Sequence, residues 1–125
     1  MHQTFGQNLR RCRRNTRVPG TGGYLTQEEF AYQLQLRLRT QDSPQAQMIS
    51  YWENDKHLPS ANKDRNVLMA IVGVLFEYGG LASVREANML LESGGYAPLT
   101  REEQTTLDQS SLQIEEIPMN PYITG

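Results

Sequence analysis

The stretch from Gln45 to Pro59 carries the side chains whose types and spacing are best suited to recognising another molecule. A glutamine amide presents a hydrogen-bond donor and an acceptor together, which matches the edge of adenine in the major groove of DNA. Met48, Ile49 and Trp52 recur at spacings that place them on one stripe of a helix. The residues that fall outside this stripe are Gln45, Gln47, Ser50 and Tyr51. The stretch therefore predicts a recognition helix that packs with one face and reads DNA bases with the other.

Local signals predict the ends of this helix. The hydroxyl of Ser43 can cap the first turn, and Pro44 suits the next position, where its missing N–H costs nothing. Because a residue before proline is disfavoured in the α region, Leu58 before Pro59 predicts an extended segment after the helix. We expect the helix to begin at Ser43 and Pro44 and to end at 54–56.

Two motifs together resemble a known family. The run LTQEEFA at 25–31 precedes ISYWENDK at 49–56, which is followed by Pro59 and Ser60. From roughly Phe5 to Ser60, the chain is similar to the lambda repressor/Cro-like helix-turn-helix family, also called Xre-like. The resemblance implies an all-α DNA-binding domain. The patch is alternatively an amphipathic helix packed in an unrelated bundle.

Two features depart from the family pattern. The spacing between the two motifs is longer than in the family, and the glycine of the usual tight turn is absent. The segment 13–24 also contains VPGTGG, which predicts a flexible surface loop between the first two helices.

The resemblance assigns roles to individual positions. The implied base-reading residues are Gln45, Ala46, Gln47, Met48, Ser50 and Tyr51. Family members also place a helix-one arginine, a glutamine at the start of helix two and residues after the recognition helix against DNA phosphates. With neighbouring basic and polar side chains added, the predicted phosphate contacts are Arg10, Arg13, Arg14, Gln27, Arg37, Arg39, Asn54, Lys56 and His57. Arg37 and Arg39 have no family counterpart, and the arginines at 10–17 are alternatively a solvated basic face.

Composition bounds the class of protein. The chain has 125 residues, of which 38% are hydrophobic, enough for one helical core. Cys12 is the single cysteine and no apolar signal-peptide core opens the chain, which together predict a cytoplasmic protein. The longest apolar run, Val67 to Phe76, is too short to cross a membrane. The net charge is −2, but residues 1–60 sum to +3 and residues 61–125 to −5, and a basic first half suits phosphate contact.

Periodicity and caps predict the other helices. A first helix from Thr4 to about Thr16 places Phe5, Leu9 and Cys12 on its buried face. The segment 64–78 is apolar nearly all round and predicts a central buried helix closed by two glycines. Capping-box pairs predict the starts of three further helices, and the pairs are Thr26–Glu29, Ser83–Glu86 and Thr100–Glu103.

Catalytic and metal sites are not indicated. The PGTGG loop at 19–23 lacks the following lysine of a phosphate-binding loop, and neither His2 nor His57 has a partner at ligand spacing. The acidic pairs fall at helix starts or in the polar C-terminal tail. We expect no enzyme activity, no cofactor and no metal.

We expect an all-α fold with a helix-turn-helix core of about four helices, two short C-terminal helices and a mobile tail. The expected parts are a helix-turn-helix DNA-binding domain with the central buried helix at 1–80, a C-terminal helical extension at 81–110, and an extended tail or linker at 111–125. The expected function is sequence-specific binding of double-stranded DNA in bacterial transcription regulation, by a homodimer joined through Ala82 to Ser110. The alternative is an N-terminal protein-docking or self-association module of a larger bacterial signalling ATPase-type protein. Residues 120–125, NPYITG, resemble the start of the nucleotide-binding domain in some of these ATPases, so a downstream domain or partner protein would then control the module.

Overall fold

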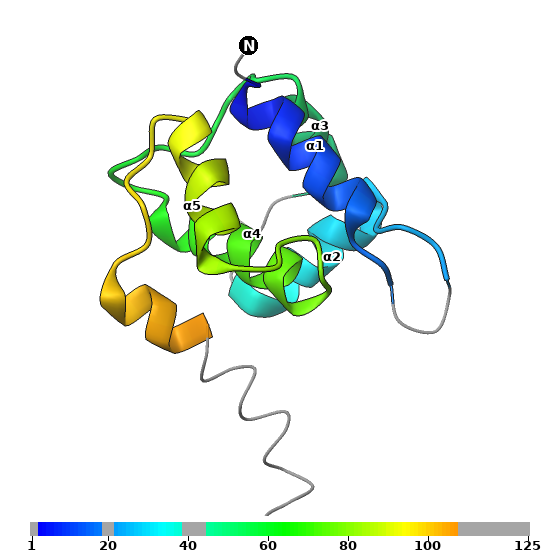
Figure 1. Cartoon of the computed structure of the whole chain (residues 1–125). Coiled ribbons are helices and arrows are strands. Elements are labelled where there is room, and N and C mark those ends of the chain that lie inside the picture. Colours follow the sequence, from blue (N-terminus) through cyan, green and yellow to red (C-terminus); the bar gives the residue numbers. More distant parts are fainter. Residues whose placement is uncertain (1–2, 19–21, 39–44, 108–125) are drawn as a thin grey trace, which may run out of the picture.

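The computed structural model describes residues 3–18, 22–38 and 45–107, and these residues form a set of packed helices (Figure 1). Five helices have defined bounds: α1 (Phe5–Asn15), α2 (Gln27–Leu38), α3 (Ala46–Glu53), α4 (Arg65–Glu77) and α5 (Val84–Ser93). A further helical segment covers 101–107. Within the described residues, strand pairing is limited to one isolated antiparallel bridge between Arg17 and Tyr24, at the base of the loop predicted at 13–24. The all-α prediction is confirmed.

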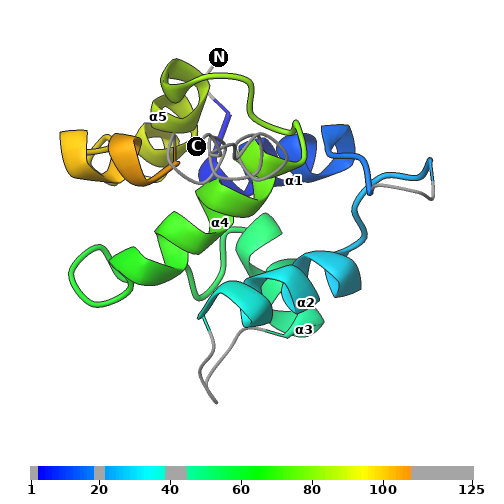
Figure 2. The ribbon, with the colours of Figure 1, turned by 90° about the horizontal axis from the view of Figure 1, so that it is seen from below.

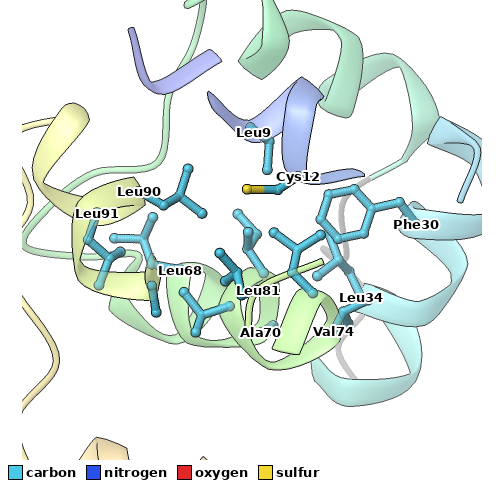
Figure 3. Close-up of a cluster of buried hydrophobic side chains, with 14 of the residues drawn as sticks. Leu9, Cys12, Phe30, Leu34, Leu68, Ala70, Val74, Leu81, Leu90 and Leu91 are labelled. Atoms are coloured by element: carbon cyan, nitrogen blue, oxygen red, sulfur yellow. The ribbon is translucent and has the colours of Figure 1, made fainter. Parts of the chain in front are cut away.

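Helix α4 lies at the centre, with α1 and α5 on one side and α2 and α3 on the other (Figure 2). Its residues from Ala70 to Leu75 are all buried, and so is Leu68. Figure 3 shows the surrounding side chains that meet it, among them Leu9 and Cys12 of α1, Phe30 and Leu34 of α2, and Leu90 and Leu91 of α5. Burying each large apolar side chain is worth roughly 1.5–3 kcal/mol, so this helix contributes much of the folding free energy. The predicted central buried helix is confirmed.

The C-terminal helices share this core. Ala87, Leu90 and Leu91 of α5 are buried, and Leu107 at the end of the 101–107 segment is 7% exposed. These helices therefore bury apolar side chains against the rest of the chain. The described part of the segment expected to form a homodimer interface, Ala82 to Ser110, thus contributes to the core of its own chain. Ser110, like the predicted tail at 111–125, lies outside the described residues.

Local signals account for the starts of four helices. Thr4 caps α1 in a complete capping box with Gln7, and the Thr26 hydroxyl accepts from the Glu29 N–H at 3.0 Å at the start of α2. The remaining caps are the hydroxyls of Ser83 and Thr100, which accept from the backbone N–H groups of Glu86 and Glu103. Asp64 precedes α4, but its carboxylate accepts from the Ser60 N–H at 2.8 Å instead of capping the helix.

The end of α4 follows the predicted glycine pattern. Gly79 has a φ of 88°, and the Gly80 N–H donates to the Leu75 carbonyl at 2.7 Å. This hydrogen bond belongs to a Schellman cap, which needs a left-handed residue that glycine adopts without a Cβ clash. None of the helices described is long and apolar enough to cross a membrane.

Helix α1 approaches α3 more closely than a side chain would permit. A Cβ added to Gly6 would lie 2.6 Å from the carbonyl oxygens of both Trp52 and Glu53. The Gly6 N–H also donates to the carboxylate of Asp55 at 2.8 Å. The start of α1 is therefore fixed directly on the C-terminal end of α3.

Candidate nucleic-acid interface

Helix α3 separates a packed face from an exposed face. Ile49 is fully buried and Trp52 is 4% exposed, and the indole N–H of Trp52 donates to the His57 carbonyl at 3.1 Å. The predicted burial of these two side chains is confirmed. Met48 was placed on the same stripe, but it is 37% exposed, so that assignment is wrong.

The six predicted base-reading residues all retain exposed surface. Gln45, Gln47 and Met48 are exposed, while Ala46, Ser50 and Tyr51 are half-buried. Gln45 is the N-cap of α3, with extended backbone and no side-chain cap hydrogen bond, so the helix starts later than the predicted Ser43 and Pro44. Those two residues lie outside the described part of the chain.

The first turns of α2 and α3 border an open groove of about 490 Å³. Thr26, Gln27 and Glu28 line it from one side, and Ala46, Gln47 and Ser50 line it from the other. Helix N-termini carry partial positive charge and unsatisfied N–H groups, which favour anionic groups such as phosphates. The exposed carboxylate of Glu28 opposes this effect at one edge of the groove.

Glu53 connects the three helices around this groove. Its side chain has no exposed surface and accepts from the Arg13 Nε at 2.5 Å and from an Arg13 terminal nitrogen at 3.0 Å. The Gln27 amide donates to the same carboxylate at 3.0 Å, and the Arg10 Nε lies 3.4 Å from it. Burial acts to raise the pKa of Glu53, but the hydrogen bonds from Arg13, Gln27 and Arg10 outweigh it and lower the pKa below its ordinary value. Glu53 is thus an ionised buried group that fixes α3 to α1 and α2.

Arg13 belongs to this buried network and not to the exposed surface. It is 5% exposed, and its remaining terminal nitrogen donates to the Leu25 carbonyl at 2.9 Å. Its guanidinium also lies 6.0 Å from the centre of the Tyr24 ring. The alternative of a solvated basic face is therefore wrong for Arg13, and this buried side chain is unavailable to a phosphate.

Arg37 also contacts another helix of the chain, although it stays exposed. It forms an ion pair with Glu77, and a Cβ added to Gly73 of α4 would lie 2.7 Å from one of its terminal nitrogens. Arg37 therefore lies against α4, and its charge is compensated by Glu77. Arg39 lies outside the described residues.

The other predicted phosphate contacts remain exposed or partly exposed. Arg10 keeps 45% of its side-chain surface, and Arg14, one turn later on α1, is also exposed. Asn54, Lys56 and His57 are exposed in the segment that follows α3. Gln27 is half-buried, and its amide nitrogen is directed to Glu53.

The described residues give little support for a metal site or for catalysis by a cysteine. These residues include no group of three or more His, Cys, Asp or Glu side chains placed to hold a metal ion. Burial raises the pKa of the Cys12 thiol, which makes it a poor nucleophile. Comparisons of the chain with family models, with curated proteins and with solved structures found no match.

Proposed function

We propose that this chain binds double-stranded DNA in a sequence-specific manner, with α3 as the recognition helix, and acts as a non-catalytic transcription regulator. The observation that carries the proposal is the division of α3 into two faces. Ile49, Trp52 and Glu53 anchor the helix, while Gln47 and the N-cap residue Gln45, each with a side-chain amide, are exposed. Such amides suit adenine, and a helix is the element that fits the major groove.

The charged side chains set the expected strength of phosphate contact. Arg13 and Arg37 are compensated by carboxylates. The other predicted cations within the described residues are exposed: Arg14, Lys56, and Arg10, which also contacts Glu53 but keeps 45% of its side-chain surface. Each neutralised phosphate contributes about −0.9 to the slope of log binding constant against log salt. Three contacts give a slope of about −3 for each protomer, which is shallower than the full predicted set would give.

A salt-dependent titration with mixed genomic DNA fragments tests the proposal. The parent chain should bind with the slope given above, and Arg14→Ala should make the slope shallower by about 1. Arg85→Ala is the matched control, since it removes an exposed arginine from α5, away from α3. Binding that is absent, or that does not depend on salt, would reject DNA binding and favour the protein-docking alternative.

We also propose that the working unit is a homodimer. One recognition helix covers a half-site, and two-fold dimers bind half-sites about one helical turn apart. Met89 of α5 supports this proposal, because its side chain is 58% exposed and belongs to the segment from Ala82 onward. It also borders a groove of about 920 Å³ between α1 and α5.

A further inference from the structure

Gln47 and Tyr51 form a connected pair on the exposed face of α3. The Gln47 Nε2 donates to the Tyr51 hydroxyl at 2.9 Å. The two residues are four positions apart, so their side chains lie one above the other on the helix surface. At about 100° of rotation per residue, both point away from Ile49 and Trp52, which define the packed face. The pair therefore occupies the middle of the surface that a groove of DNA would meet.

The ring of Tyr51 is held from its other side by the segment after α3. The imidazole of His57 packs against it edge-on, with ring centres 5.1 Å apart and planes at 67°. His57 has a left-handed φ of 52°, and its carbonyl accepts from the indole N–H of the buried Trp52. The Lys56 N–H donates to the Tyr51 carbonyl at 2.8 Å. A chain of contacts thus runs from the core through His57 and Tyr51 to the exposed Gln47 amide.

We infer, building on the proposed DNA binding, that Tyr51 is a positioning residue that makes Gln47 selective for adenine. A free glutamine amide has two N–H donors and a carbonyl acceptor. With one N–H committed to Tyr51, Gln47 presents one donor beside one acceptor. Adenine presents the matching acceptor and donor at N7 and N6.

The hydrogen bond from Gln47 to Tyr51 also disfavours the other bases. Guanine presents two acceptors in the major groove, and the single remaining N–H of Gln47 can satisfy one of them while its carbonyl faces the other. Cytosine and thymine each present one hydrogen-bonding group there, so neither forms a bidentate pair with the amide. Holding the amide also avoids part of the entropy cost of ordering a long side chain on binding.

The Tyr51→Phe variant isolates this role, because it removes the hydroxyl and keeps the ring against His57. Each variant would be put through selection from a random-sequence duplex pool, then competition with duplexes changed at one base pair. The parent should prefer adenine at one position by roughly ten- to a hundredfold, and Gln47→Ala should abolish that preference. Tyr51→Phe should lose most of it, with an unchanged melting temperature and salt slope. Tyr32→Phe is the matched control, since it removes a hydroxyl from a tyrosine that is 52% exposed on α2.

A double-mutant cycle separates positioning from direct contact. If Tyr51 acts through Gln47, the Tyr51→Phe, Gln47→Ala double variant should select no worse than Gln47→Ala alone. Additive losses, or a Tyr51→Phe variant that keeps the parent's adenine preference, would overturn the inference and leave DNA binding in place. A parent chain that shows no salt-dependent binding to the pool would overturn both proposals.

Discussion

Replacing Glu53 with alanine tests whether the buried ion pair fixes α3 to its neighbours. The side chain of Glu53 has no exposed surface, and that of Arg13 keeps 6%. Glu53→Ala would leave the Arg13 guanidinium buried with the Leu25 carbonyl as its remaining acceptor, and would leave the Gln27 amide without its acceptor. Removing one partner of a buried pair costs about 3–5 kcal/mol, because the other charge stays desolvated. Since small domains have unfolding free energies of about 5–15 kcal/mol, the variant should lose a large part of its stability.

Urea unfolding gives the measurement. Trp52, the single tryptophan, adjoins Glu53 in sequence and reports on the transition by fluorescence. Glu102→Ala serves as the control, because it removes an exposed glutamate from the 101–107 helix. Replacing both Arg13 and Glu53 with methionine should recover most of the loss, since an apolar pair removes the stranded charge. A Glu53→Ala variant within about 0.5 kcal/mol of the parent, the range of ordinary surface substitutions, would refute the reasoning.

Three further perturbations test the packing, the titration and the assembly. Gly6→Ala should destabilise the chain by about 1–3 kcal/mol, because the added methyl group meets backbone carbonyls of α3. Gly73→Ala should destabilise it less, because the added methyl group meets the flexible guanidinium of Arg37. Equal losses of stability in thermal unfolding would contradict this. The pKa of Glu53 is lowered from 4.5, so its contribution to stability should be complete above pH 4.5 and lost as the pH falls through the lowered folded value. Unfolding free energies measured across this range should fall less steeply in Glu53→Gln than in the parent, and identical slopes would count against an ionised Glu53. Met89→Lys should convert a dimer to a monomer in light scattering, and a parent that is monomeric at high concentration, both free and on DNA, would reject the dimer.

Features that depend on nearby residues were predictable from the sequence. The hydroxyls of Thr26, Ser83 and Thr100 cap helices through N–H groups three residues ahead, so each signal lies within one turn of chain. The central helix was likewise visible because its apolar side chains are continuous over 67–76. The start of α3 was not predictable in this way, because Ser43 and Pro44 carry a good local signal and Gln45 nevertheless takes the N-cap position.

Features that depend on pairing between distant segments were missed. Five arginines at 10–17 look equivalent in sequence, and their spacing does not show that Arg13 pairs with Glu53, 40 positions away. Gly6 has no local sign of its role, since the atoms that exclude a Cβ belong to α3. The sequence alone does not distinguish Arg37 from the other predicted phosphate contacts, whereas the structure pairs it with Glu77, 40 positions away. Such contacts are set by how helices cross and not by periodicity within one helix.

The packed face of α3 contains Glu53 and not Met48, and this arrangement bears on the proposed DNA binding as well as on stability. At about 100° per residue, Met48 and Glu53 lie nearly equally far from the midpoint of Ile49 and Trp52, on opposite sides. Hydrophobicity favours burying Met48, yet the structure buries Glu53, because Arg13, Arg10 and Gln27 compensate the carboxylate there. With Ile49, Trp52 and Glu53 packed, Gln47 and Tyr51 fall near the middle of the opposite face of α3, and Met48 falls near its edge. Any base contact by Met48 should then be peripheral, and specificity should rest on Gln47.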